Sequence, residues 1–294
     1  MPARDESREI LLITNPTSGR GRARAWAEAA LAQLQQEGRA ARIVSARELA
    51  PSNGAPAEEW VFGGDGTLNE LLQRLGADAP PISIFPTGTG NVVARELEIP
   101  RTLHGALENA RRGTPHPFDV GRINGRRFAF MVSIGIDAEL VRRVAERRSG
   151  PMRRSDWLFA AFARPRCDEL PFTVALDGGP PESARYAAIF NCGLYAGGFR
   201  VCPRARWNDG LFHVLTLKEP IQPRWVRFTF AAWRGRPEQF ADASLRTARR
   251  VVISGAPRSQ IDGDPGPSGD LEIEIEPAAV RLRGAADAAA RLSS

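Results

Sequence analysis

Short apolar runs alternate with amphipathic stretches over the first third of the chain. Runs of strand length occupy 9–14, 41–45, 60–62 and 82–85. Stretches with helical periodicity lie at 22–37, 67–75, 92–97 and 103–112. Gly38 and Gly76 end two of these stretches. Strands that alternate with helices are typical of a parallel sheet, so we predict an α/β domain over residues 1–118.

The pattern changes after Phe118. An Asn124-Gly125 pair between apolar segments at 120–123 and 127–133 predicts a two-residue hairpin. Further strands are predicted at 172–176, 187–192, 211–217, 251–254 and 271–275, with helices at 138–148, 157–163 and 224–234. We therefore predict an antiparallel second domain, a β-sandwich or a barrel, over residues 119–279. The pattern leaves open whether residues 280–294 rejoin the first domain.

Composition agrees with two domains and restricts the chemistry. A chain of 294 residues exceeds what one hydrophobic core usually organises, and 43% hydrophobic residues are enough for two. Among 40 Lys and Arg residues, Lys218 is the one lysine. Its neighbours belong to no lysine motif, which excludes a P-loop, a protein-kinase lysine and a cofactor Schiff base. Phosphate would have to be bound by backbone amides, helix N-termini, a metal ion and arginine.

The formal net charge of +6 predicts an anionic partner: nucleic acid, a phosphorylated ligand or a membrane surface. We expect no nucleic acid, because no helix-turn-helix, zinc or RNP signature is present. The three cysteines, Cys167, Cys192 and Cys202, lack CxxC spacing, which favours a reducing cytosol and small buried side chains. Residues 1–9 lack the apolar stretch of a signal peptide, and 186–199 is too short to span a bilayer. We expect a cytoplasmic protein, soluble or peripheral at the inner face of the membrane.

The segment 15–21 (NPTSGRG) follows the first predicted strand and precedes a helix. Free amides at such a crossing, together with the helix dipole, favour an anion. The segment is no GxGxxG fingerprint, because Arg24 stands where the third glycine would be, and it lacks the lysine of a Walker loop. A strand-to-helix turn capped by Ser18 or Asn15 is the structural alternative.

Two more glycine-rich segments follow later strands. Segment 63–70 (GGDGTLNE) places three glycines and Asp65 at a strand-to-helix crossing, where glycine lets the backbone approach phosphate and Asp65 can hold a metal or a ribose hydroxyl. Thr67 and Glu70 also fit a capping box. Segment 86–91 (PTGTGN) repeats the arrangement after the next strand. Several such loops on one sheet edge predict a site for a polyphosphate.

These segments, together with 118–121 (FDVG) and the Asn124-Gly125 hairpin, resemble the diacylglycerol kinase catalytic-domain family, which includes bacterial lipid kinases and the sphingosine and ceramide kinases. The resemblance runs in order from about residue 11 to 265. It implies an α/β N-terminal domain of the NAD kinase/diacylglycerol kinase type that binds ATP, a C-terminal antiparallel β-sandwich domain that carries the lipid, and a catalytic cleft between them.

The resemblance also implies which residues contact ATP and Mg²⁺. The nucleotide contacts are Asn15, Pro16, Thr17, Ser18, Gly19, Ser45, Gly63, Gly64, Asp65, Gly66, Thr67, Leu68, Asn69, Glu70, Gly88, Thr89 and Asn91. Asp65 is expected near the phosphates and their Mg²⁺, and Arg20 and Arg22 stand beside the first loop.

Family members use a glutamate after a late Asp-Gly pair as the general base. This chain reads IDGDP at 261–265, so the resemblance places Asp264 in that role, with a side chain about one methylene shorter. The same residues also make a good turn. Bacterial members hold a structural Mg²⁺, which here implies the Asp209 side chain and the carbonyls of Arg206 and Leu211 as ligands. Asn208-Asp209-Gly210 is equally a tight turn.

Two stretches, 142–159 and 224–236, place arginines beside aromatic residues. Such stretches suit docking on anionic lipid, and they suit equally a solvated arginine face over a packed aromatic face.

The resemblance predicts an ATP-dependent lipid kinase with Asp264 and Asp65 as catalytic residues. Two alternatives are an NAD kinase, since that related family also carries a GGDG loop, and a catalytically weak lipid-binding regulator, in view of the aspartate at position 264. Diacylglycerol, sphingoid bases, ceramides and phosphatidylglycerol all stay open as the lipid, and so does a homodimer.

Overall fold

The computed structural model describes residues 9–15, 21–46, 58–76, 79–147, 167–195 and 198–291. The chain divides into two compact units, one formed by Met1–Phe118 with Ala278–Ser294 and the other by Asp119–Pro277. Two strands, β5 (Thr114–Ile123) and β18 (Gly269–Gly284), run from one unit into the other. The C-terminal segment therefore belongs to the first unit.

The first unit is built on a parallel sheet, as its alternating pattern predicts. Its strands pair in the order β2-β1-β3-β4, and all three pairings are parallel. The second half of β18 adds a parallel pairing to β4 through Leu282 and Ile82. The strands are β1 (Ile10–Thr14), β2 (Ala41–Ser45), β3 (Glu58–Gly63) and β4 (Ile82–Pro86).

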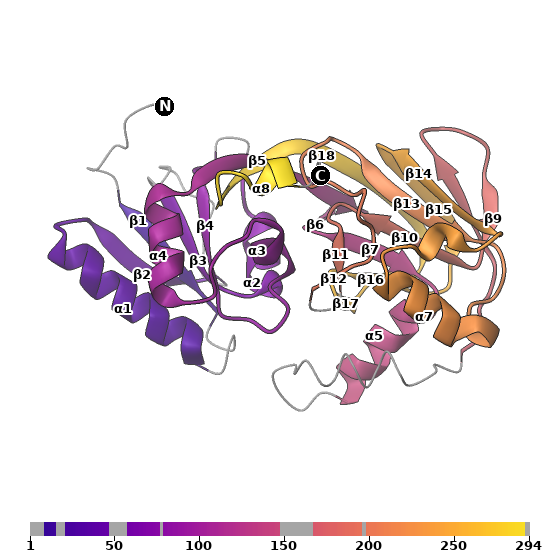
Figure 1. Cartoon of the computed structure of the whole chain (residues 1–294), viewed down its shortest axis with the longest axis horizontal. Helices are drawn as coiled ribbons and strands as arrows, with labels where there is room; N and C mark the ends of the chain where they lie inside the picture. Colours follow the sequence, from indigo (N-terminus) through magenta and orange to yellow (C-terminus); the bar gives the residue numbers. More distant parts are fainter. Residues whose placement is uncertain are drawn as a thin grey trace. The chain divides into compact units, whose positions relative to one another are not determined.

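Helices cover this sheet on two sides (Figure 1). They are α1 (Arg22–Gln36), α2 (Asp65–Leu72), α3 (Val92–Glu96) and α4 (Leu103–Arg112). The short terminal helix α8 (Ala288–Arg291) follows β18. The alanine-rich faces of α1 and α4 pack with Trp60, Phe62 and Phe85 in one buried cluster. Phe62 and Phe85 stack with ring centroids 4.1 Å apart. Small residues on the helices let them approach the aromatic face of the sheet closely.

The second unit is antiparallel. One sheet has the strand order β14-β13-β10-β7-β16-β17. A second set pairs the first half of β18 with β15, β15 with β8, and β8 with β9. The strands are β6 (Arg126–Phe128), β7 (Met131–Ile134), β8 (Phe172–Leu176), β9 (Glu182–Ala184), β10 (Tyr186–Phe190), β11 (Leu194–Tyr195), β12 (Phe199–Arg200), β13 (Phe212–Leu217), β14 (Ala243–Ala248), β15 (Arg250–Ala256), β16 (Ser259–Ile261) and β17 (Asp264–Pro265). The helices are α5 (Ile136–Arg147), α7 (Trp225–Trp233) and the 3-10 turns η2 (Gln222–Arg224) and η3 (Pro237–Gln239).

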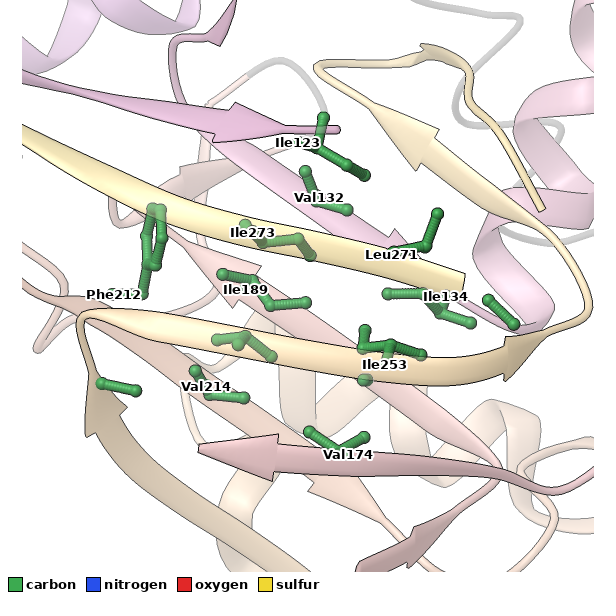
Figure 2. Close-up of a cluster of buried hydrophobic side chains, with 14 of the residues drawn as sticks. Ile123, Val132, Ile134, Val174, Ile189, Phe212, Val214, Ile253, Leu271 and Ile273 are labelled. Atoms are coloured by element: carbon green, nitrogen blue, oxygen red, sulfur yellow. The ribbon is translucent and has the colours of Figure 1, made fainter. Parts of the chain in front are cut away.

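The core of the second unit lies between these two layers (Figure 2). Ile253 on β15 and Ile273 on β18 belong to the same buried cluster as Ile189 on β10 and Val214 on β13. Alternate residues of each of these strands belong to this cluster, and the β18 segment LEIEI shows the alternation most clearly, with its glutamates exposed. The predicted fold class, an α/β domain with a parallel sheet and an antiparallel sandwich, is confirmed.

Several local predictions need correction. The strand predicted at 127–133 is two strands, β6 and β7, because the N–H groups of Ala129, Phe130 and Met131 donate to the Asp262 carboxylate instead of continuing one ladder. The strand predicted at 271–275 is longer and continues past Ala278, which has a left-handed φ of 51°, to Gly284. The helix predicted at 157–163 lies outside the described residues. Cys192 and Cys202 are buried as expected, but Cys167 is only partly buried.

The Asn124-Gly125 hairpin is present, with φ of 45° and 86° at its two turn residues, the conformation that a two-residue turn of this type requires. None of the helices within the described ranges combines the length and the apolar character that crossing a bilayer requires.

Candidate functional site

The glycine-rich segments of the first unit meet at one edge of its parallel sheet. Strands β1 to β4 are parallel, so their carboxyl ends share an edge. Asn15 follows β1, Ser45 ends β2 opposite Thr14, Gly63 ends β3, and Pro86 ends β4. This edge is where α/β sheets bind ligands. Pro16, Thr17, Ser18 and Gly19 of the first loop, and Arg20 beside it, lie outside the described residues.

The loops after β3 and β4 are joined by direct backbone contact. The Gly63 carbonyl accepts hydrogen bonds from the Thr87 N–H at 3.0 Å and the Gly88 N–H at 3.4 Å. A Cβ on Gly88 would lie 2.5 Å from the Gly64 Cα, and a Cβ on Gly64 would lie 3.0 Å from the Gly88 Cα. Both positions therefore need glycine, because any side chain would push the two loops apart.

Gly66 has different surroundings. It lies in the first turn of α2, it is exposed, and no heavy atom lies within 4 Å of where its Cβ would be. The first N–H groups of a helix have no partner within the helix, and the dipole makes that end positive. The open space beside Gly66 therefore adjoins a helix end that favours a phosphate group.

Asp65 links the two loops. It is the first residue of α2, and its Oδ1 accepts a hydrogen bond from the Val93 N–H at 3.3 Å, at the start of α3. Desolvation raises the pKa of the Asp65 carboxyl above its usual value, and the backbone N–H groups of Asn91, Val92 and Val93 partly oppose that shift. A single carboxylate with bound phosphates and water suits Mg²⁺, so the donor set at Asp65 fits that ion.

Asn91 shapes the loop after β4, which we call the second loop. It adopts a left-handed conformation with φ of 49°, and its Nδ2 donates to the Gly88 carbonyl at 2.8 Å and to the Pro86 carbonyl at 3.4 Å. Its side-chain Oδ1 is buried without a hydrogen-bond partner among the described residues. Asparagine is among the few non-glycine residues that tolerate this conformation. Asn91 therefore fixes the loop, and Gly88 and Thr89 are partly buried beside it.

Glu70 binds Asn15 and does not cap its own helix. The Asn15 Nδ2 donates to the two carboxylate oxygens of Glu70 at 3.2 and 3.4 Å, which ties the first loop to α2. The predicted capping box of Thr67 and Glu70 is wrong: the N-cap of α2 is Gly64, and no side chain caps it. The helix begins two residues earlier than predicted, because Gly64 and Asp65 already turn the backbone. Gly21 is the N-cap of α1, so Asn15 does not cap that helix either.

The other side chains of the GGDGTLNE segment face inward. Thr67, Leu68 and Asn69 are 3%, 1% and 7% exposed. Thr67 occupies the space that a side chain on Gly63 would need, since a Cβ there would lie 2.2 Å from the Thr67 Oγ1. Gly66 is the one exposed residue of this segment, and Gly64, Asp65 and Glu70 are partly exposed.

Arginines of the first unit hold the second loop. The Arg22 guanidinium donates to the Thr87 carbonyl at 2.7 Å, and Arg95 donates to the Gly90 carbonyl at 3.0 Å. The role of Arg95 was not predicted from the sequence. The available signal was its position within one helical turn of the PTGTGN segment. The single lysine, Lys218, lies in the second unit with its Nζ 3.9 Å from Glu182.

Asp264 stands next to a tightly held turn in the second unit. Asp262 and Gly263 form the turn between β16 and β17 with φ of 51° and 87°. The Asp262 carboxylate accepts hydrogen bonds from the N–H groups of Ala129, Phe130 and Met131 at 2.6, 2.9 and 2.8 Å. Asp264 itself is exposed. This turn therefore presents an accessible carboxylate at Asp264, and Asp262 is a further functional residue that the sequence pattern did not predict.

A buried hydrogen-bond chain supports the same turn. The Gly263 N–H donates to the Gln260 Oε1 at 2.8 Å, the Gln260 Nε2 donates to the Ser133 Oγ at 2.8 Å, and the Ser133 hydroxyl donates to Asp137 at 2.6 Å. Burial raises the pKa of Asp137 to about 6, against the lowering effect of the Ser133 hydrogen bond. Ser133 and Gln260 alternate with the core residues Val132, Ile134 and Ile261, so they lie on the other face of the sheet, and both are 0% exposed there.

Asp209 forms a turn in this structure. Its Oδ1 accepts a hydrogen bond from the Leu211 N–H at 3.0 Å, and its Oδ2 lies 3.1 Å from the His213 Nε2. Within the described ranges, no three His, Cys, Asp or Glu side chains gather where they could hold a metal ion. The ligand set of Asp209 with the Arg206 and Leu211 carbonyls stays a prediction.

Comparisons with known proteins cover both units. The sequence model described as the diacylglycerol kinase catalytic domain matches residues 9–123, and the YegS C-terminal NAD kinase beta sandwich-like domain matches residues 130–284. A diacylglycerol kinase of Mycobacterium tuberculosis is 30% identical over 95% of this chain and 96% of its own length. A diacylglycerol kinase of Bacillus subtilis is 25% identical over 86% and 88%. The solved structure of a putative diacylglycerol kinase from Bacillus anthracis has a TM-score of 0.77 at 19% identity, over 96% of this chain and 98% of that one, which shows the shared fold.

Proposed function

Since the chain belongs to the diacylglycerol kinase catalytic-domain family, we propose that it transfers the γ-phosphate of ATP to a hydroxyl group of a lipid. The observation that carries the proposal is the pair of glycine loops joined through Gly63, Gly64 and Gly88 at the carboxyl edge of the parallel sheet. Loops of this kind provide closely spaced amides for a polyphosphate without any lysine.

The chain's own groups then perform the positioning. The open N-terminal turn of α2 beside Gly66 receives phosphate, and Arg22 and Arg95 hold the neighbouring loop in place. Asp65 would hold Mg²⁺, which when bound neutralises the charge of the phosphates. Phosphoryl transfer depends mainly on such positioning and charge neutralisation, so a rigid double loop meets most of the requirement.

On the acceptor side, we propose Asp264 as the general base. It is exposed at the start of β17, and the turn before it is fixed by Asp262 and Gln260. A general base must lie within hydrogen-bond reach of the proton it accepts. An aspartate is shorter than the glutamate of the family. The lipid hydroxyl would therefore have to bind closer to the turn that carries Asp264.

The lipid acceptor implies where the protein works. We propose that it makes peripheral contact with an anionic membrane surface, on the cytoplasmic side where ATP is available. The relatives that match along the whole chain are named diacylglycerol kinases, which does not favour an NAD kinase or a catalytically weak regulator.

The test uses the purified protein with labelled ATP and Mg²⁺. The acceptors are diacylglycerol, a sphingoid base, ceramide and phosphatidylglycerol, each dispersed in detergent, and NAD in a parallel reaction. The proposal predicts label in at least one lipid and none in NAD, with the labelled lipid lost in Asp264→Asn. Label in NAD alone, or an Asp264→Asn variant with wild-type activity, would contradict it.

A further inference from the structure

Helix α7 exposes three large apolar side chains in one row. Val226, Phe230 and Trp233 are 81%, 51% and 58% exposed, and their spacing of four and then three residues places them on one face of the helix. We call this row the α7 outer face. Two other large apolar residues in the described ranges are comparably exposed, Leu170 at 55% and Phe199 at 38%.

The inner side of α7 packs against the core of the second unit. Trp225, Phe228 and Ala231 are buried there, and the Phe228 ring lies 5.4 Å from the Tyr186 ring and 6.0 Å from the Phe240 ring. A helix that packs on one side normally carries polar residues on the other. The apolar residues of the outer face are therefore unexplained by the core of the second unit.

The charged residues of α7 and of the short segments next to it in the chain are all of one sign. Between residues 220 and 237 the chain has four arginines and no acidic residue. Arg224 is neutralised by Asp242, which holds its guanidinium with two hydrogen bonds. Arg227, Arg234 and Arg236 are exposed. The Arg234 guanidinium lies 5.5 Å from the centre of the Phe230 ring, so a cation stands directly beside the exposed aromatic residue.

Strand β12 extends the same surface. It packs against α7, and Phe199 and Arg200 on it are both exposed. Gly235, with φ of 66°, ends the helix where a Cβ would lie 2.7 Å from the Arg200 carbonyl. The close approach at Gly235 thus brings the apolar and cationic pair of β12 beside the end of the α7 outer face.

From this arrangement we propose that α7 lies in the interface of an anionic membrane, with Val226, Phe230 and Trp233 inserted below the headgroups and Arg227 and Arg234 on the lipid phosphates. Exposed aromatic and aliphatic residues bordered by arginine are the composition of interfacial helices. The choice of occupant rests on the proposed lipid kinase function, whose substrate lies in such a surface.

Charge complementarity selects the membrane over a second copy of the chain. A symmetric dimer through the α7 outer face would bring the arginines of one copy against those of the other. Anionic headgroups instead supply the opposite charge to the exposed arginines Arg227, Arg234 and Arg236 beside this face.

Vesicle sedimentation without ATP tests the contact independently of catalysis. Wild-type protein is expected to bind vesicles of phosphatidylglycerol and phosphatidylcholine, and to bind pure phosphatidylcholine weakly. The variant Phe230→Ser/Trp233→Ser should lose about tenfold or more of its partition coefficient. Leu170→Ser, which removes an equally exposed apolar residue elsewhere in the second unit, should bind as the wild type does.

The arginines have a matched test. Arg227→Gln and Arg234→Gln should each weaken binding to the anionic vesicles by about fivefold, and Arg126→Gln, an exposed arginine on β6, should have no effect. On binding, tryptophan emission should shift to the blue and be quenched by lipids brominated in their acyl chains. Both signals should fall in Trp233→Phe while sedimentation persists.

Two outcomes would overturn the proposal. One is wild-type binding by the Phe230→Ser/Trp233→Ser variant. The other is a wild-type dimer in sedimentation velocity without lipid that this variant converts to a monomer, which would assign the face to a second copy. Kinase activity on detergent-dispersed lipid separates the membrane contact from the proposed function. A variant that loses vesicle binding but keeps this activity supports the membrane contact. A wild type that binds vesicles but has no kinase activity contradicts only the proposed function.

Discussion

Gly88 lies so close to Gly64 that a Cβ on Gly88 would be 2.5 Å from the Gly64 Cα. Residues 24 positions apart in the sequence thus form one continuous backbone surface at the sheet edge. The pairing explains why glycine is needed in both loops for the chain's own packing, before any ligand binds.

Replacing Gly88 with alanine should separate the loops. We expect Gly88→Ala to lower the free energy of unfolding by about 1–3 kcal/mol, the usual range for overpacking, and to weaken ATP binding strongly. Chemical denaturation and nucleotide-binding calorimetry measure the two effects.

Gly66→Ala is the matched control, because its Cβ would enter open space. Within the first turn of a helix alanine is favoured over glycine, so the protein should be as stable as the wild type or up to about 1 kcal/mol more stable. Since we place phosphate beside this residue, ATP binding should still weaken. Unchanged ATP binding in Gly66→Ala would contradict that placement.

Asp262 and Asp264 should separate structural from catalytic loss. Asp262→Asn removes the charge of the carboxylate that accepts three backbone hydrogen bonds. We expect the free energy of unfolding to fall by about 2–3 kcal/mol and the kinase activity to be lost. Asp264→Asn changes an exposed side chain, so the melting temperature should stay within about a degree of the wild type while lipid phosphorylation is lost. Equal stability of the two variants would refute the division of roles.

Gln260 should act through the turn that it supports. Gln260→Met keeps the volume but loses the hydrogen bonds to Gly263 and Ser133, and the expected cost is about 1–3 kcal/mol. If the chain of hydrogen bonds positions Asp264, kcat should fall while KM for ATP is unchanged. Gln239→Met, an exposed glutamine in η3, serves as the control and should change neither quantity.

Glu59 should make stability depend on pH. It is 5% exposed on β3, and burial raises its pKa from 4.5 to about 7. A carboxyl whose pKa rises on folding binds its proton more tightly in the folded state, so this group loses stabilising free energy as pH rises from about 4.5 to about 7. Glu59→Gln should therefore flatten the pH dependence over that window, by a total of about 3 kcal/mol. Urea titrations of both proteins at pH 5 and pH 8 give the unfolding free energy at each pH. The same difference between the two pH values in the wild type and in Glu59→Gln would contradict the prediction.

The sequence was most informative where periodicity was regular. Strands Ala41–Ser45 and Phe172–Leu176 and helix Leu103–Arg112 have the predicted bounds, because each is a clean apolar or amphipathic pattern with turn residues at its ends. The Asn124-Gly125 turn was equally local. The glycine at position 121, in the FDVG segment, has a cause that the sequence does not show. A Cβ on Gly121 would lie 2.1 Å from the Cζ of the Phe128 ring.

What the sequence did not predict depends on contacts between distant segments. Asp262 looks like an ordinary turn residue until its three hydrogen bonds to residues 129–131 are known. Glu70 stands at capping-box spacing, yet it binds Asn15, which is 55 residues away. Local propensity cannot encode such long-range polar contacts, and they are the contacts that hold the candidate site.

The most direct measurement is lipid phosphorylation by the wild type, Asp264→Asn and Asp264→Glu at matched ATP saturation. The account predicts labelled lipid from the wild type, label reduced to background in Asp264→Asn with ATP affinity unchanged, and activity retained in Asp264→Glu. Label in Asp264→Asn equal to that of the wild type would contradict the assignment of the base, and no labelled lipid from the wild type with any acceptor would contradict the kinase itself.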